Sequence, residues 1–185
     1  MNPFWPTRTP AQLTAMPDHV PLPGMHTSAQ GRAFIEAFEG LYLHAYNDGT
    51  GVQTIGYGHT SQAGPPRVYP GMTITQVEAD RILSADLMSV ELEVLHLVKK
   101  MPLKQYQFDS LISFQFNTGW LGHPNCSLLR ALNSGNYKLA DDDFALYDRA
   151  GGKVMRGLMR RRKGEAQMFA GFVQVALQTA GVKNA

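Results

Sequence analysis

The stretch from 75 to 101 carries a long helical pattern, and the length of that helix limits the folds open to the chain. Apolar residues recur at the spacing of one helix face, at Ala79, Leu83, Leu87, Val90, Val94 and Leu97. Thr75 and Glu78 form a capping-box pattern at its start, and Pro102 closes it. A helix of roughly 25 residues spans about 37 Å, the length of a small protein. It therefore bridges two lobes or forms the spine of one.

The segment before this helix predicts a short helix followed by a β-hairpin. Thr27 or Ser28 can cap the short helix, whose apolar stripe includes Phe34. Gly40 is a natural stop, because glycine takes the left-handed conformation at low cost. From 41 to 58 the pattern is strand-like, and the NDGTG sequence at 47–51 is a strong hairpin signal. Residues 60–72 are expected to form a loop.

Every later segment favours helix. One helix over 103–119 is expected to end at Asn117 and Gly119, and a short one over 127–135 to be capped by Ser127. Two more cover 137–148 and 155–180. The predicted fold class is therefore α+β, mostly α, with one hairpin. The Pro-rich segment 1–27 shows no period and is expected to be an extended arm, which leaves 28–185 as the folded domain.

The charge of the chain is small but unevenly distributed. The 185 residues carry a net charge of +2. Seven basic residues lie between 149 and 163, and no acidic residue lies among them. Such a cluster favours anionic partners, whether nucleic acid, acidic lipid or acidic cell-wall polymer. A solvated helix face is the structural alternative.

Two absences in the sequence also carry expectations. Cys126 is the one cysteine, so no intrachain disulfide forms, and we expect a small core residue rather than a catalytic thiol. The first residues show no basic start leading into an unbroken apolar run, and the apolar run at 168–177 is far short of the roughly 20 residues that span a bilayer. We therefore expect a protein made and folded in the cytoplasm, without stable membrane insertion.

Two carboxylates lie in unlike surroundings on either side of Gly40. Glu39 is in the last turn of its helix, where the negative helix end and a neighbouring aromatic ring are expected to raise its pKa. Asp48 is in a polar turn, where water and backbone N–H groups are expected to keep it ionised. Carboxyls whose pKa values are pushed apart suit acid/base catalysis. The alternative is that the segment is merely a tight hairpin.

Other chemical motifs fit poorly. The glycines at 49–58 lack the Gly-Lys-Ser/Thr ending of a phosphate loop, and NDGTG lacks the alternating acids of a calcium loop. The histidines show no metal-ligand spacing, and no Gly-x-Ser-x-Gly element is present. For His59, a structural role bonded to a carboxylate is weighed against a catalytic one.

Several motifs in order resemble the phage-type lysozymes, the muramidases of glycoside hydrolase family 24. They are Glu39-Gly40, Asp48, Thr54 with TIGYGHT at 54–60, QFDSLISFQFNTG at 107–119, SLLRALNSGNY at 127–137 and AGGKVMRGLMRRRKGEAQMF at 150–169. The resemblance covers roughly 28–172. It implies a lysozyme-like two-lobed fold, with a hairpin lobe over about 41–72 and a helical lobe over about 73–185 plus the first helix, joined by the long helix.

The resemblance also implies a reaction and its residues. Glu39 would protonate the leaving oxygen of the β-1,4 bond between N-acetylmuramic acid and N-acetylglucosamine in peptidoglycan. Asp48 would hold or activate a water on the opposite face, and Thr54 would help to place it. Inversion at the anomeric carbon is the hypothesis, since a water fits between carboxyls ~6.5–9.5 Å apart. His59, Asn117, Tyr147 and Arg161 are predicted to contact substrate; Tyr147 stands near the place where relatives carry a tryptophan.

The expected biology is that of an endolysin acting in host lysis. It would be a monomer without metal or cofactor, would bind peptidoglycan and an anionic envelope surface through 149–163, and would have no nucleic-acid partner. It would stay in the host cytoplasm until a holin pore lets it reach the wall. The alternatives are an antibacterial effector, a tail-associated muramidase, a lytic transglycosylase and a non-catalytic peptidoglycan-binding relative.

Overall fold

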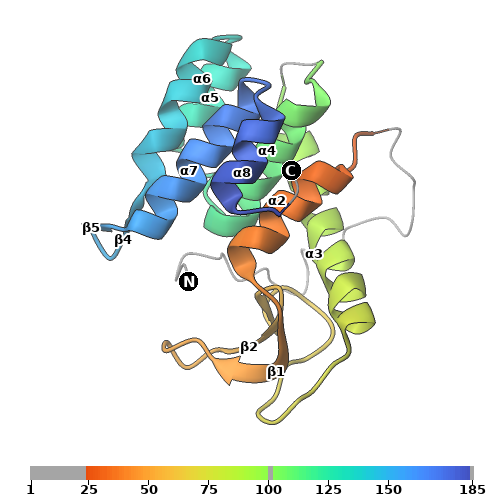
Figure 1. The fold of residues 1–185 in the computed structure, drawn as a ribbon. Coiled ribbons are helices and arrows are strands. Elements are labelled where there is room, and N and C mark those ends of the chain that lie inside the picture. The colour runs from red at the N-terminus through yellow and green to blue at the C-terminus, as the bar shows by residue number, and fades with distance from the viewer. Residues whose placement is uncertain (1–23, 100–101, 184–185) are drawn as a thin grey trace.

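The computed structural model describes residues 24–99 and 102–183. A body of helices lies over a small β-sheet, and helix α3 runs between them (Figure 1). α3 contacts β2 and β3 at the sheet and α4 in the helical body. The mostly helical α+β prediction is confirmed, with a long helix linking the two parts. Most of the arm predicted over 1–27 lies outside the described residues.

The sheet has three antiparallel strands in the order β1-β2-β3, one more than the predicted hairpin. They are β1 (Tyr42–Asn47), β2 (Gln53–Gly56) and β3 (His59–Thr60). The register of β1 shifts, because Tyr42 faces Gly56 while Tyr46 faces Thr54. Four residues of β1 are thus matched by two of β2, and such a bulge re-aims side chains. The third strand was missed because it is only two residues long.

Helix α2 (Ala29–Glu39) begins and ends where its sequence predicts. Ser28 caps it, accepting a hydrogen bond from the Gly31 N–H and donating one to Asp109 Oδ2 at 2.6 Å. Gly40 follows with a φ of 71° and a ψ of 163°, a positive φ as expected but outside the left-handed helical region. The chain turns at Gly40 and enters β1 two residues later, at Tyr42.

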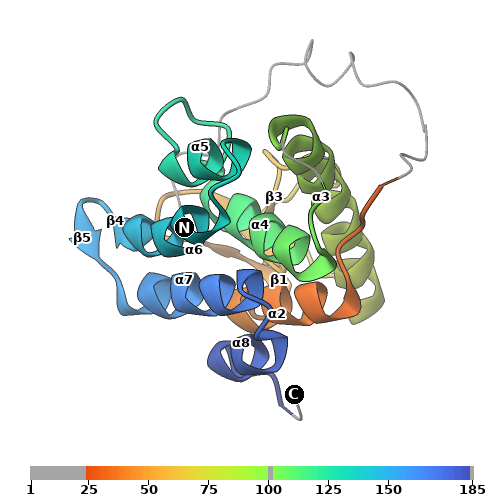
Figure 2. The same cartoon turned by 90° about the horizontal axis from the view of Figure 1, so that it is seen from above.

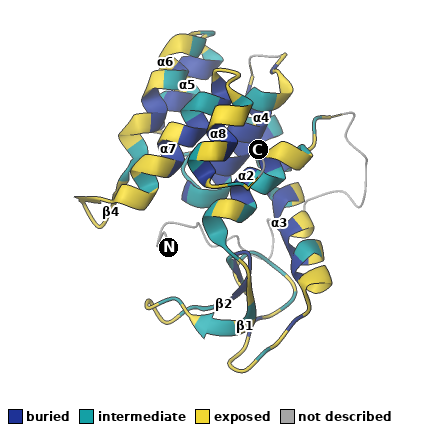
Figure 3. Ribbon diagram, in the orientation of Figure 1, coloured by how far each residue is buried: buried dark blue, intermediate teal, exposed yellow. Residues whose placement is uncertain are grey.

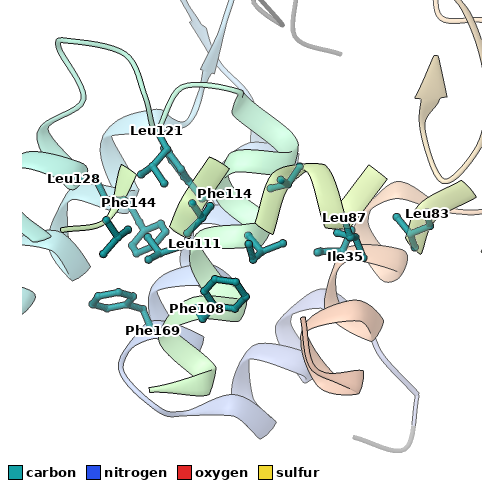
Figure 4. Close-up of a cluster of buried hydrophobic side chains, with 14 of the residues drawn as sticks. Ile35, Leu83, Leu87, Phe108, Leu111, Phe114, Leu121, Leu128, Phe144 and Phe169 are labelled. Carbon is teal, nitrogen blue, oxygen red and sulfur yellow. The ribbon is translucent and has the colours of Figure 1, made fainter. Parts of the chain in front are cut away.

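Helix α3 (Gln76–Leu97) is the predicted long helix, at 22 residues. Both hydrogen bonds of the capping box between Thr75 and Glu78 are present. The helix ends before Val98, whose backbone is extended, and so is shorter than predicted. Its buried face includes Leu83 and Leu87, which pack near Ile35 of α2 (Figure 4).

The helical body is built around α4 (Gln105–Thr118), which ends at a left-handed Gly119 as predicted. Around it lie α5 (Ser127–Asn133), α6 (Tyr137–Asp143) and the 3₁₀ turn η1 (Phe144–Tyr147). Phe108, Leu111 and Phe114 of α4 are fully buried among Leu121, Leu128 and Phe144 (Figure 4). The cap predicted at Ser127 is wrong: Cys126 occupies the cap position, and the Ser127 N–H bonds the Tyr147 hydroxyl instead.

The single helix predicted over 155–180 is two helices. α7 (Arg156–Phe169) stops near Gly171, whose φ is 92°, and α8 (Val173–Ala180) turns back against α7 and α2 on the outside of the body (Figure 2). A short hairpin, β4 (Arg149–Ala150) with β5 (Lys153–Val154), precedes α7 and was also missed. Its turn residues Gly151 and Gly152 both have positive φ, as a two-residue hairpin turn requires.

Gly164 allows α7 to approach α2 closely, and we predict that it cannot be enlarged cheaply. A Cβ at this position would lie 2.8 Å from a ring carbon of the buried Phe34. Gly164→Ala should therefore lower the free energy of unfolding by about 1–3 kcal/mol through overpacking. Denaturant unfolding measures the change.

Gly157→Ala in the same helix is the matched control. No atom lies within 4 Å of a Cβ built there, so the substitution should be neutral or stabilise by up to about 1 kcal/mol. Equal effects of the two variants would contradict the packing argument.

Candidate active site

Glu39 lies at the junction of the helical body and the sheet. It is the last residue of α2, and its side chain is 20% exposed. The hairpin returns close to it, since a Cβ at Gly58 would lie 3.4 Å from Glu39 Oε2. Gly58 has a φ of +87°, so a glycine suits both the conformation and the space. The carboxyl is thus held at the edge of the sheet and still reaches solvent.

A buried arginine contacts Glu39 directly. Arg161, on α7 and 3% exposed, donates from Nη1 to Glu39 Oε1, from Nε to Glu165 Oε1 at 3.2 Å and from Nη2 to the Ser113 carbonyl at 3.3 Å. The sequence analysis placed Arg161 among substrate-binding residues in a basic surface. Its donors are directed at protein acceptors beneath the surface, and its contact with substrate stays a prediction. In the structure Arg161 is the ion-pair partner of Glu39.

Arg162 extends the same network to Asn117. Its Nη2 donates to Asn117 Oδ1 at 2.9 Å and to Glu165 Oε1 at 2.8 Å, and its guanidinium lies over the Phe114 ring. Asn117 is half-buried in the last turn of α4. Its carbonyl is therefore occupied by protein, and a substrate contact through its amide group stays a prediction.

Asp48 lies in the turn between β1 and β2. Its Oδ1 accepts hydrogen bonds from the Thr50 N–H at 2.8 Å, the Thr50 hydroxyl at 2.8 Å and the Val52 N–H at 3.2 Å. Desolvation raises the pKa of Asp48, but these hydrogen bonds outweigh it, and the pKa lies below its usual value. The expectation of a polar turn that keeps Asp48 ionised is confirmed.

Tyr46 of β1 is a further residue of this region, and the sequence motifs do not include it. Its pKa is raised, first by burial and then by Tyr42, Glu39 and Asp48. The phenol therefore lies within the electrostatic fields of both acids. Its ring centroid is 4.6 Å from that of Tyr42, although a regular strand would separate residues i and i+4 by about 13 Å. The bulge in β1 brings the rings together, and sequence patterns do not show it.

Thr54 faces Tyr46 across the β1–β2 pair and is fully buried. Its hydroxyl donates to the Val52 carbonyl at 3.4 Å. Thr54 thus belongs to the strand that carries the turn of Asp48. Its part in placing a water stays a prediction.

His59 is hydrogen-bonded to a carboxylate, as its structural interpretation predicts, and its contact with substrate stays a prediction. Its side chain is 1% exposed, with Nδ1 at 2.8 Å from Asp86 Oδ2 and Nε2 at 2.9 Å from the Pro66 carbonyl. Burial lowers the pKa of His59. The hydrogen-bonded Asp86 carboxylate and the Pro66 carbonyl raise it by more than burial lowers it, so the net shift is upward. Both ring nitrogens face acceptors, which suits an imidazolium that ties β3 to α3.

Tyr147 turns its hydroxyl inward. The hydroxyl accepts from the Ser127 N–H at 3.0 Å and lies 3.5 Å from Cys126 Sγ, and the ring meets Phe114 edge-on. The ring is half-buried, so its predicted contact with substrate stays a prediction for the ring edge alone.

Burial raises the pKa of the Cys126 thiol, which is 1% exposed, as expected of a core residue rather than a nucleophile.

The described residues contain neither a metal cluster nor a membrane span. No three His, Cys, Asp or Glu side chains within 24–99 and 102–183 are placed to hold an ion. In the same ranges no helix is long and apolar enough to cross a bilayer.

Comparison with known proteins places this fold in the lysozyme-like class. The structure is similar to an endolysin from Escherichia coli O157:H7 phage FAHEc1, with a TM-score of 0.70 and 33% identity over 78% of this chain and 93% of that one. The family model for phage lysozyme matches residues 36–165. The chain therefore belongs to the phage lysozyme family.

Individual relatives cover the same region. The endolysin of Salmonella phage P22 is 39% identical over 145 residues, which are 78% of this chain and 98% of the relative. The endolysin of Acyrthosiphon pisum secondary endosymbiont phage 1 is 36% identical over 149 residues, again 78% and 98%. The family resemblance inferred from the motifs is confirmed, and with it a lysozyme-type glycoside hydrolase.

The pair formed by His59 and Asp86 should give the protein a pH-dependent stability. The pKa of His59 is raised in the folded state, so the pair stabilises fully below the unfolded pKa of about 6.5 and less as pH rises through the folded pKa. Asp86→Asn should lower the free energy of unfolding by on the order of 3 kcal/mol at about pH 6, because the buried cation loses its partner.

Denaturant unfolding of wild type and variant across pH measures this effect. The difference between them should shrink as pH rises above about 6.5. A constant difference would mean that His59 is neutral in the folded protein throughout.

Proposed function

We propose that this protein is a phage endolysin, a muramidase that hydrolyses the β-1,4 bond between N-acetylmuramic acid and N-acetylglucosamine in peptidoglycan during host lysis. The observation that carries the proposal is that residues 36–165, which match the phage lysozyme family, place one carboxyl, Glu39, at the end of α2 beside Gly58 and a second, Asp48, in the turn between β1 and β2. A carboxyl pair is what glycoside hydrolysis uses.

The two carboxyls take different parts in the reaction. Glu39 gives its proton to the leaving glycosidic oxygen as the bond from the anomeric carbon to that oxygen breaks. A water held by Asp48 and Thr54 forms the new bond to the anomeric carbon from the opposite face and gives its proton to Asp48. Glu39 and Asp48 then exchange protons with solvent, and the configuration is inverted.

Arg161 supports the acid in this scheme. Its guanidinium contacts Glu39 and is itself fixed by Glu165 and Ser113. When Glu39 gives up its proton, the carboxylate left behind already faces a positive charge that needs no reorganisation. Arg161 is a positioning residue, since it acts on Glu39 and has its remaining donors in the protein.

Removing either carboxyl should abolish hydrolysis while leaving the fold intact. Glu39→Gln and Asp48→Asn should each lower the rate by at least about 100-fold, as expected for loss of a general acid or base. Glu36→Gln is the matched control, three residues earlier in α2, where the carboxylate pairs with Arg32 at the surface. It should stay within about twofold of wild type.

Turbidity loss on outer-membrane-stripped cell walls measures the rate, and mass spectrometry identifies the sugars. Activity in Glu39→Gln equal to wild type would overturn the assignment. An anhydro product would indicate a transglycosylase, and wall binding without cleavage by wild type a binding relative. The anomer formed first, read by NMR, tests inversion, which a retained configuration would overturn.

The second part of the proposal is a basic surface. It contains fewer residues than the basic run in the sequence, because two arginines of that run are buried. Arg161 and Arg162 are 3% and 1% exposed and neutralised by Glu39 and Glu165, so they do not contribute to it. The basic surface consists of the exposed residues Arg149, Lys153, Arg156, Arg160 and Lys163. Its β4–β5 hairpin projects from the body and is exposed throughout (Figure 3). This surface is suited to the anionic cell envelope.

Neutralising two of these charges should weaken wall binding in a salt-dependent way. Lys153→Gln with Arg156→Gln should reduce binding to purified walls several-fold at low salt, and the difference should vanish at about 1 M salt, where the Debye length is about 3 Å. Arg67→Gln with Arg81→Gln makes the same change of net charge at exposed positions elsewhere. Equal losses of wall binding in the two double variants would indicate an effect of net charge alone. That result would contradict a specific role for the basic surface.

The route by which the enzyme reaches the cell wall is the remaining part of the proposal. Relatives matched over most of this chain include proteins named SAR-endolysins, such as that of Bacteriophage PS119, at 34% identity over 130 residues. Release through a holin pore, as expected from the sequence, therefore stays a prediction, as do the effector and tail-associated alternatives.

A further inference from the structure

The carboxylate of Asp48 is held through only one of its oxygens. Oδ1 accepts three hydrogen bonds, from the N–H and the hydroxyl of Thr50 at 2.8 Å each and from the N–H of Val52 at 3.2 Å. No donor within 24–99 or 102–183 lies within hydrogen-bond distance of Oδ2. A carboxylate has about four lone-pair directions, two on each oxygen, so three donors fully occupy Oδ1 and leave those of Oδ2 open.

This asymmetry fixes the orientation of the group. Turning the carboxylate about its terminal bond would break all three hydrogen bonds at once, and bonds to a charged acceptor are roughly twice as strong as neutral ones. Oδ1 therefore stays on the turn, and Oδ2 points away from it. Asp48 is half-buried, so the oxygen directed away from the turn is accessible to water.

Only one of the three donors depends on a side chain. The N–H groups of Thr50 and Val52 would be present whatever residues stood there, whereas the hydroxyl requires Thr or Ser at position 50. Thr50 is exposed, and within the described residues its hydroxyl bonds only Asp48. Asn47 holds the rest of the turn, because its Oδ1 accepts from the N–H groups of Gly49 at 2.9 Å and Gly51 at 3.1 Å.

We infer that Thr50 is a positioning residue for the proposed hydrolysis, whose hydroxyl holds Oδ1 of Asp48 so that Oδ2 binds the attacking water. In that step the water oxygen bonds to the anomeric carbon, one water proton passes to Oδ2, and the glycosidic oxygen leaves with the proton of Glu39. Thr50 touches neither water nor sugar. The inference rests on the proposed function, because it assigns an atom to the role proposed for Asp48.

The groups around Asp48 set the pH at which this arrangement works. On β1, Tyr46 lies close enough for Asp48 to raise its pKa, and beyond it Glu39 stands at the end of α2. The turn from 49 to 53 carries no charged side chain. The hydrogen bonds from Thr50 are therefore the main influences that lower the pKa of Asp48, ahead of that from Val52.

Thr50→Val and Thr50→Ser test the inference, because valine keeps the shape of threonine and serine keeps its hydroxyl. For Thr50→Val, kcat should fall by about tenfold with KM within about twofold, since a charge-assisted hydrogen bond that orients the base is lost. The acid limb of the pH–rate profile should move to higher pH, because the carboxylate loses a donor. Thr50→Ser should restore both.

A carbon-13 NMR titration of the Asp48 carboxyl, assigned with Asp48→Asn, gives the same shift without any turnover. Thermal unfolding checks that both variants fold. An unchanged kcat and acid limb in Thr50→Val, or a serine variant that resembles valine, overturns the inference while the role of Asp48 stands. Full activity in Asp48→Asn overturns both together.

Discussion

The buried ion pairs around Arg161 hold in place the end of α2 that carries Glu39. Arg161 joins Glu39 on α2 to Ser113 on α4 and Glu165 on α7, and Arg162 links Glu165 onward to Asn117. Two guanidinium and two carboxyl groups meet in this network, and each is largely removed from water. Burying a charge costs free energy, and the attraction of an ion pair offsets this cost only when its geometry is well fixed. The acid is therefore held by the packing of three helices rather than by its own turn.

The second carboxyl is held by the opposite means. Asp48 depends on backbone and hydroxyl donors within five residues of chain. One acid is thus placed by long-range contacts and the other by local geometry. Tyr46 lies at the irregular part of β1, and its pKa is raised first by burial and then by Tyr42 and both carboxyls. Errors in helix packing should consequently displace Glu39, and errors in the turn should displace Asp48.

The features that sequence predicted are those set by neighbouring residues. The capping box of α3, the stop at Gly40 and the ionised Asp48 depend on contacts within a few positions, and all three are present. The contact between Glu39 and Arg161 spans 122 residues, so no local pattern could reveal it. The basic run concealed two buried arginines for the same reason. The break at Gly171 was missed because the apolar pattern continues on both sides of it.

The position of Cys126 makes this chain a convenient background for site-specific labelling. It is the one cysteine in the sequence, it is 1% exposed, and burial raises its thiol pKa, so maleimide reagents should react with it slowly. A cysteine introduced at Val154 in the β4–β5 hairpin and another at Tyr69 in the loop before α3 would both be exposed. Dyes at these two points could follow the distance between the helical body and the sheet in single molecules, without removing the native cysteine.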